Sequence, residues 1–406
     1  MITLNGAKTI SGETIDITLE NPVTTTIPAG HLTVFPGLID PHVHFRTPGM
    51  EYKEDWRTAS KAALVGGYTT VFDMPNTIPP TVSAELLRDK KALIDAQLKE
   101  IGIPLRYELY FGADKAHLSE IHNIRDHVIG IKIFMGCSTG NLVIDDDESL
   151  HAVFAIAATQ NLLVAVHAED EALLKIRKQQ LQSTHYCDHS VIRNIEVATR
   201  AVEKAIALTR IYGNRLYVLH VSSAEEIQLI RQAKAEGLAV YAETTPHHLF
   251  LHDTAYEQLQ GKAVVNPPLR AKTHQDILFA AIRDGIIDTI GSDHAPHLLS
   301  EKEKKYGECP SGMPGIETTL PLLLTAHHQG LLSLSQILNL TCYRARDIFG
   351  LPANDDKVLV DLEQTKTVNS AALKTKCGWS AFEGQSLRGW PVYAILRNQL
   401  FDLNSI

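Results

Sequence analysis

The chain has 406 residues, 44% of them hydrophobic, so it can bury a large core. Its 38 lysines and arginines against 47 aspartates and glutamates give a net charge of −9, which argues against a nucleic-acid-binding or anionic-membrane surface. No basic segment precedes an apolar stretch at the N-terminus and no run of about 18 apolar residues occurs, so we expect neither a signal peptide nor a membrane span. The five cysteines are scattered without a CxxC pair, which predicts a reducing, cytoplasmic location.

Short apolar, β-rich runs alternate with helical patterns such as 84–99 and 192–212. Alternating strands and helices form parallel βαβ units, so eight such runs predict a closed (β/α)₈ TIM-type barrel over residues 36–350. An open, doubly wound sheet would gather its site at one switch point, whereas here the candidate ligands end several different strands. The eight predicted strands are 38–45, 69–75, 106–112, 128–135, 162–168, 215–222, 238–245 and 287–293.

Both ends of the chain differ from the middle. Residues 1–35 and 351–406 carry short polar and β-branched runs, and 358–362 and 391–396 resemble strands. We therefore predict a small β domain, built from both termini, that flanks the barrel. The charged run 301–305 (EKEKK) is predicted to be a solvated surface segment.

The first barrel strand ends in His42 and His44, two imidazoles that point to the same face of a strand. His167, His220 and Asp293 end later strands. A lone strand histidine is more often structural than a ligand, and the pair alone would leave both interpretations open. Together the five residues indicate a metal site. Imidazole and carboxylate ligands without cysteine favour Zn²⁺, with Mn²⁺ or Co²⁺ as substitutes.

Lys132 lies within an apolar strand, where a charged ammonium group is costly. Burial lowers the pKa of a lysine, and the neutral amine can react with CO₂ to give a carbamate that bridges two cations. The alternative is a lysine paired with a carboxylate; the other candidate ligands favour the carbamate. Two metals held in this way would activate a bridging hydroxide, and Asp293 would accept its proton and pass it to a departing nitrogen. This chemistry suits hydrolysis, or its reverse, at an amide-like centre.

This set of ligands resembles the amidohydrolase superfamily over nearly the whole chain. Several segments are similar to dihydroorotase motifs: 40–49 (DPHVHFRTPG), 74–77 (MPNT), 265–270 (VNPPLR), 291–297 (GSDHAPH) and 377–384 (CGWSAFEG). The resemblance implies reversible cyclisation of N-carbamoyl-L-aspartate to L-dihydroorotate in pyrimidine (UMP) biosynthesis, by a homodimer or larger homo-oligomer. It also implies two metal ions, and Lys132 indicates the carboxylated-lysine branch of the family. Their ligands would be His42, His44, Lys132, His167, His220 and Asp293.

The resemblance further implies that Arg46, Asn76 and His297 bind the substrate carboxylate, with Asn266 near the ring. Arg46 lies two residues beyond His44 and offers a two-pronged donor to a carboxylate. A surface ion pair for Arg46 and a turn position for Asn76 are the alternatives.

Three details go beyond the motifs. Thr47 stands where many relatives carry an acidic residue, which leaves open what supports the neighbouring arginine. Residues 138–141 could form a lid with Thr139 as a donor, or a plain turn. His247 and His248 are adjacent and cannot both face the site, so we expect them to be structural or to support the ligands.

Two rival functions remain. One is a related cyclic amide hydrolase, either a dihydropyrimidinase (hydantoinase) or an allantoinase; Asn76 and the segment 266–270 favour dihydroorotase over both. The other is a non-catalytic scaffold homologue, against which all six filled ligand positions argue.

Overall fold

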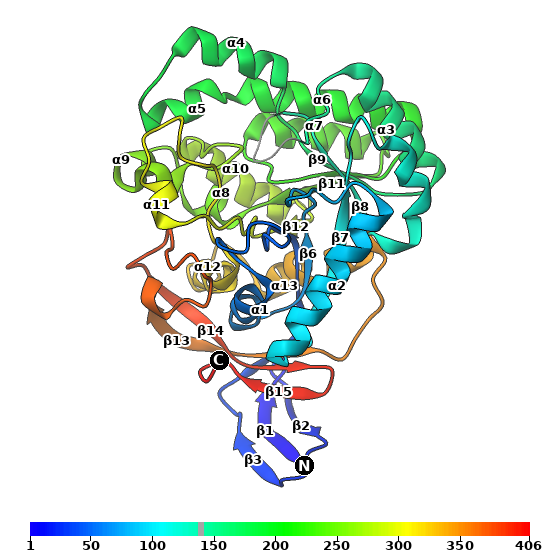
Figure 1. The fold of residues 1–406 in the computed structure, drawn as a ribbon. Coiled ribbons are helices and arrows are strands. Elements are labelled where there is room, and N and C mark those ends of the chain that lie inside the picture. The colour runs from blue at the N-terminus through cyan, green and yellow to red at the C-terminus, as the bar shows by residue number, and fades with distance from the viewer. Residues whose placement is uncertain (137–141) are drawn as a thin grey trace.

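Eight parallel strands form a nearly closed barrel surrounded by helices, which confirms the (β/α)₈ fold predicted from the sequence (Figure 1). The computed structural model describes residues 1–136 and 142–406, so the predicted lid at 138–141, with Thr139, lies outside the described residues. Strand order follows chain order, and the ends of the sheet meet where the His44 N–H donates to the His294 carbonyl at 2.9 Å. The barrel strands are β5 (Leu38–Val43), β6 (Tyr68–Asp73), β7 (Arg106–Gly112), β8 (Gly130–Phe134), β9 (Val164–His167), β10 (Leu216–Val218), β11 (Val240–Thr244) and β12 (Thr289–Ile290).

The barrel strands are buried on both faces, which explains their continuous apolar runs in the sequence. All six residues of β6 and all five of β8 are buried. Several strands end earlier than predicted, and β12 holds only two residues. The candidate ligands His220 and Asp293 follow their strands in left-handed backbone, with φ of 41° and 45°. They therefore lie on turns that leave the strands at the carboxyl end of the barrel.

The helices begin and end at residues suited to those positions. Asp55 and Ser83 accept hydrogen bonds from first-turn N–H groups of α1 and α2, and Gly102 ends α2 in the left-handed region. The helices predicted near 84–99 and 192–212 are confirmed as α2 and α6. Within residues 1–136 and 142–406, none of the helices is both long and apolar enough to cross a membrane. The α-helices are α1 (Trp56–Val65), α2 (Ala84–Ile101), α3 (Asp147–Thr159), α4 (Glu171–Leu181), α5 (His189–Ile192), α6 (Ile195–Tyr212), α7 (Ala224–Ala235), α8 (Pro246–Phe250), α9 (Ala255–Leu259), α10 (Lys272–Arg283), α11 (Leu299–Lys302), α12 (Ile316–His328), α13 (Leu334–Leu338) and α14 (Arg344–Phe349).

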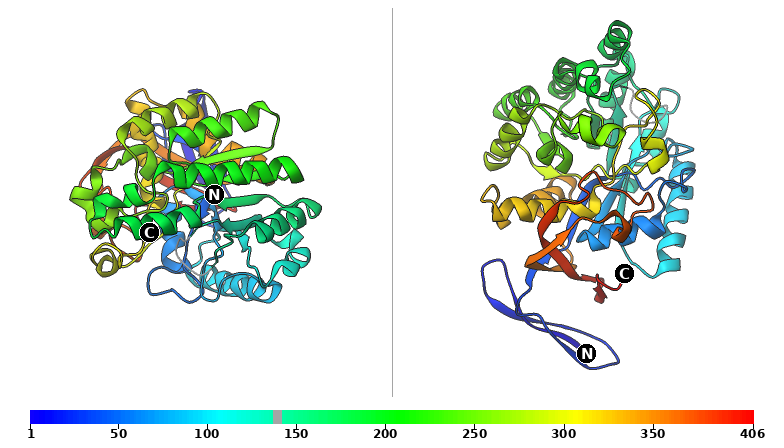
Figure 2. Two further views of the ribbon diagram at one scale, coloured as in Figure 1. Left: turned by 90° about the horizontal axis from the view of Figure 1, so that it is seen from above. Right: turned by 90° about the vertical axis from the view of Figure 1, so that its left-hand side faces the viewer.

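A second sheet draws its strands from both ends of the chain. Its order is β15-β14-β13-β4-β1-β2, with β3 paired to β1, and the strands predicted at 358–362 and 391–396 lie in β13 and β14. In side view β1–β3 project away from the barrel (Figure 2). The domain limits at 35/36 and 350/351 stay a prediction. The strands are β1 (Ile2–Lys8), β2 (Thr14–Leu19), β3 (Thr25–Pro28), β4 (Thr33–Pro36), β13 (Lys357–Thr367), β14 (Ser386–Leu396) and β15 (Gln399–Asp402).

Candidate active site at the carboxyl end of the barrel

Three of the predicted metal ligands converge on one point. The Asp293 Oδ1 atom lies 3.2 Å from His42 Nε2 and 3.1 Å from His44 Nε2, and these side chains are at most 11% exposed. One potential ligand atom from each residue lies within 4.8 Å of the other two. The arrangement provides two nitrogens and a carboxylate oxygen for one cation, although Asp293 lies 249 positions beyond His44 in the chain.

His167 and His220 form a second pair beside this cluster. The His167 Nδ1 and His220 Nε2 atoms are 2.9 Å apart, and the His220 ring lies 5.5 Å from the His42 ring, centroid to centroid. Burial lowers the pKa of both imidazoles, so both are neutral, as metal ligands must be. Within the described part of the chain, His220 Nδ1 is buried without a hydrogen-bond partner. This donor chemistry fits a bound cation.

Lys132 is 1% exposed on β8, and its Nζ lies 4.6 Å from the centre of the Phe134 ring. Burial lowers the pKa of Lys132 to about 7, although the charges of Asp293 and Glu243 oppose this shift. A substantial share of neutral amine is therefore present near neutral pH. Neutral amine is the form that reacts with CO₂, so the lysine fits the predicted carbamate.

The Nδ1 sides of His42 and His44 are each held by an oxygen. His42 Nδ1 donates to Glu243 Oε1 at 2.8 Å, and His44 Nδ1 donates to Asn76 Oδ1 at 2.8 Å. These bonds leave Nε2 of both rings directed at Asp293, where each can act as a ligand. The sequence assigned Asn76 to the substrate carboxylate. In the structure its Oδ1 contacts His44, and the role toward substrate stays a prediction.

Sequence reasoning missed two supporting carboxylates. Glu243 is the last residue but one of β11, and it also accepts hydrogen bonds from the His220 N–H at 3.2 Å and the Tyr217 hydroxyl at 2.9 Å. Glu169 lies 2.9 Å from His167 Nε2 and also pairs with Arg193. Both positions carried a usable signal, because an acidic residue at the end of an apolar strand is costly to bury without a partner.

Arg46 and His297 lie together beside the metal-ligand candidates. Arg46 is 2% exposed; its Nε donates to the Pro296 carbonyl at 3.1 Å and its Nη2 lies 3.1 Å from His297 Nε2. Burial lowers the pKa of Arg46 to about 10, against the opposing charge of Asp293. The Thr47 hydroxyl is buried without a partner among the described residues, so Arg46 is oriented by the 296–297 segment instead.

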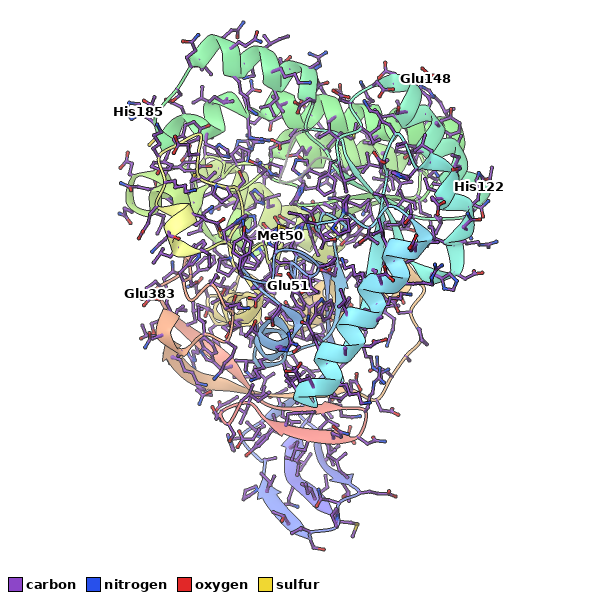
Figure 3. The ribbon with its side chains drawn as sticks, viewed as in Figure 1. Met50, Glu51, His122, Glu148, His185 and Glu383 are labelled. Carbon is purple, nitrogen blue, oxygen red and sulfur yellow. The ribbon has the colours of Figure 1, made fainter. Side chains whose placement is uncertain are left out.

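A lysine reaches the other side of the same imidazole. Lys53 Nζ lies 2.9 Å from His297 Nδ1 and 3.0 Å from Glu301 Oε1. Burial, then Arg46 and Lys53, hold the pKa of His297 well below its usual range, so the ring is neutral. The loop that carries Arg46 and Lys53 crosses the middle of the molecule, where Met50 and Glu51 are labelled in Figure 3. His122, Glu148 and His185 lie at its edge in the same view.

The prediction that 301–305 is a solvated segment was wrong for Lys302. Lys302 is 1% exposed, and its Nζ donates to the carbonyls of Pro310 at 2.6 Å and Val264 at 3.1 Å. Burial lowers the pKa of Lys302 to about 7. Arg46, Lys53 and Lys302 together form what we call the cationic cluster, with Glu301 as its carboxylate.

The remaining predicted residues lie around this centre. Asn266 Oδ1 accepts a hydrogen bond from His189 Nε2 at 3.0 Å. This contact involves none of the metal-ligand candidates. His247 and His248 are both buried. Burial lowers the pKa of His247 to about 4 while the Asp293 charge opposes the shift, and His248 Nε2 donates to the Pro267 carbonyl at 3.1 Å. These contacts agree with the supporting role predicted for the two histidines.

Residues 33–355 match the family model described as Amidohydrolase family. The chain belongs to the amidohydrolase family. This family is metal-dependent, and the cluster of His42, His44 and Asp293 could bind a metal. The chain is therefore a metal-dependent amidohydrolase, as predicted.

The similar proteins carry two names, dihydroorotase and hydantoinase. The dihydroorotase of Halobacterium salinarum is 36% identical, covering 86% of this chain and 82% of that protein. The dihydroorotase of Methanosarcina acetivorans is 35% identical, covering 95% of this chain and 83% of that protein. An L-hydantoinase of Paenarthrobacter aurescens is 30% identical, covering 96% and 87%. Among solved structures, an L-hydantoinase from Arthrobacter aurescens superposes with a TM-score of 0.91 at 27% identity, covering 98% of this chain and 95% of that one.

Proposed function

We propose that this chain is a cytoplasmic dihydroorotase that interconverts N-carbamoyl-L-aspartate and L-dihydroorotate. The observation that carries this proposal is the buried guanidinium of Arg46 beside Asp293, with Lys53 on the far side of His297. Of the nearby carboxylates, Glu301 pairs with Lys53, and Asp293 contacts His42 and His44. Among the described residues the Arg46 guanidinium contacts a carbonyl and an imidazole but forms no ion pair, which favours an anionic ligand group. Both compounds present a carboxylate, whereas hydantoin, dihydrouracil and allantoin do not. Four dihydroorotase relatives at 31–36% identity support the same assignment.

The proposal includes two divalent metal ions, preferably Zn²⁺ with Mn²⁺ or Co²⁺ as substitutes. The imidazole-rich donor set without cysteine and the lowered pKa of Lys132, about 7, support this part. When bound, such ions supply Lewis acidity and lower the pKa of water. Their ligands would be His42, His44, the carbamate of Lys132, His167, His220 and Asp293.

The protein's own groups divide the remaining work. Arg46 and His297 bind and orient the substrate carboxylate, and Asn266 lies toward the ring. Asp293 accepts a proton from the attacking water and returns it to the departing ring nitrogen; cyclisation uses the same group in reverse. Burial would raise the pKa of Asp293, but His42 and His44 overcome this and hold it well below its usual range. The carboxylate is therefore ionised, as a base must be.

The decisive experiment compares turnover of L-dihydroorotate with that of hydantoin, dihydrouracil and allantoin. We expect turnover of L-dihydroorotate alone. Arg46→Met should lose at least tenfold in kcat/KM for it, because one charge-assisted contact contributes about 1.5–3 kcal/mol, while metal content stays unchanged. Arg57→Met is the matched control, since Arg57 pairs with Glu100 on the surface.

The second candidate function is hydantoin hydrolysis, which the TM-score of 0.91 to an L-hydantoinase favours. Faster turnover of hydantoin than of L-dihydroorotate would establish it and reject the carboxylate argument. No turnover of any of the four compounds by metal-loaded protein would instead support the non-catalytic scaffold.

A further inference from the structure

A cavity of about 260 Å³ lies at the amino ends of the barrel strands, opposite the metal-ligand candidates. Its lining includes Gly37 and Ile39 at the start of β5 and Arg106, the first residue of β7. The segment after α14 and the turn between β14 and β15 close its other side. The cavity therefore lies between the barrel and the second sheet, which are drawn one above the other in Figure 1.

The charge of this lining is opposite to that of the whole chain. Arg106, Arg346 and Arg397 line the cavity with a single carboxylic acid, Glu108, although the net charge of the chain is −9. Arg106 is neutralised, because its Nε and Nη2 lie 2.6 and 3.3 Å from the carboxylate oxygens of Asp356. The guanidinium groups of Arg346 and Arg397 are therefore the positive charges that an anion in the cavity would balance.

Two of these arginines remain available to a ligand. In the described part of the chain neither Arg346 nor Arg397 forms an ion pair, and Arg346 lies 5.4 Å from the centre of the Tyr343 ring. The Arg397 N–H donates to Asp356 Oδ1 at 3.0 Å, so the turn that carries this side chain is tied to the carboxylate that also holds Arg106. The Arg397 side chain, which lines the cavity, therefore extends from a turn whose backbone is held in place.

The lining also indicates the class of ligand. A guanidinium presents a two-pronged donor to phosphate or carboxylate, while Tyr107, Leu351 and Pro352 offer apolar surface to a carbon skeleton. The carboxyl group of Glu108 in the same lining can pair with a hydroxyl or amino group of the same molecule. The volume suits a small metabolite.

We propose that this cavity binds a small organic anion, with its phosphate or carboxylate between Arg346 and Arg397. Catalytic groups of such barrels lie at the carboxyl ends of the strands, so this ligand is distinct from the substrate. It joins the barrel to the second sheet and stabilises the folded chain by mass action.

The test is thermal unfolding of the metal-loaded enzyme in rising inorganic phosphate and, separately, rising succinate, at ionic strength held constant with chloride. The wild type should show a saturable rise in Tm with one or both anions, and the more effective anion identifies the ligand class. Arg346→Gln combined with Arg397→Gln should weaken the apparent Kd at least tenfold. Arg388→Gln, which removes a surface guanidinium paired with Glu363, should respond like the wild type. All three proteins should retain equal activity without added anion.

An equal rise in Tm for the wild type and the double variant would overturn the proposal. It would assign the effect to anion binding at the candidate active site or to weak binding over the whole surface. Absence of a saturable response in the wild type would overturn it as well. If the double variant does not fold, Arg397→Gln alone replaces it, because this side chain is exposed at a turn. Neither outcome depends on which ring the enzyme hydrolyses.

Discussion

Glu243→Gln tests how the carboxylate behind the ligands contributes to metal binding. Glu243 is fully buried and accepts three hydrogen bonds: from His42 Nδ1 at 2.8 Å, from the His220 N–H at 3.2 Å and from the Tyr217 hydroxyl at 2.9 Å. Glutamine keeps the size and one oxygen acceptor, so the first two bonds can persist at that oxygen. The Tyr217 hydroxyl lies 2.6 Å from Thr289 Oγ1 and can donate there instead. The substitution therefore removes mainly the negative charge.

Loss of that charge makes His42 a weaker ligand. Changes to groups that support metal-bound histidines typically reduce metal affinity by about 10–100-fold, which corresponds to about 1.4–2.7 kcal/mol. The Kd for Zn²⁺ should rise by this factor when measured by competition with a chelator. Glu243→Ala should in addition lower stability by about 1–3 kcal/mol for each buried donor left without a partner.

Glu236→Gln is the matched control, because Glu236 is an exposed partner of Arg210. This variant should bind zinc with the Kd of the wild type. Circular dichroism at the assay temperature confirms that each variant is folded. An unchanged Kd in folded Glu243→Gln would refute the argument that this carboxylate strengthens His42 as a ligand.

Three further outcomes are expected. Lys132→Ala should lose metal and activity, with partial rescue by short-chain acids; an unmodified lysine mass in the metal-loaded native protein would contradict the carbamate. Lys53→Met should raise KM for L-dihydroorotate at least tenfold with unchanged metal content, because His297 loses a 2.9 Å contact; an unchanged KM would exclude this role. Burial raises the pKa of Glu317 to about 7, so the stability it contributes is complete below about pH 4.5 and is lost as the pH rises through 7. In denaturant unfolding, the free energy of unfolding of Glu317→Gln should change less with pH between 4.5 and 7 than that of the wild type. The same pH dependence in both proteins would contradict this role of Glu317.

The metal-ligand candidates were predictable because each follows an apolar strand, and parallel strands of a barrel bring their carboxyl ends together. His42, His44 and Asp293 meet for this reason alone. Glu243 and Glu169 were missed because an acidic residue near the end of an apolar strand signals that it needs a partner, but not which residue that partner is. The pairing of β11 with its neighbours β10 and β12 brings Glu243 to the metal-ligand candidates.

The burial of Lys302 also depends on contacts that local composition does not reveal. The run 301–305 alternates charge and suggests solvent exposure, yet Nζ of its second residue is fixed by carbonyls 38 and 8 positions away. Glu301 is likewise held by Lys53 across the loop after β5. Charge patterning describes the average surface, whereas a folded site can bury individual charges where several partners compensate for lost hydration.

Backbone conformation marks the site independently of side-chain chemistry. Arg46, His220 and Asp293 adopt left-handed φ values of 65°, 41° and 45°, a region that costs a non-glycine residue about 1–3 kcal/mol. This geometry explains why the strands end before the predicted positions. Such strain persists only where surrounding contacts determine it, as the bonds of Arg46 to Pro296 and of Asp293 to His44 do here. Three strained residues at one end of one barrel are best explained by a requirement on side-chain direction. Each of these three side chains must turn from its strand toward the barrel axis.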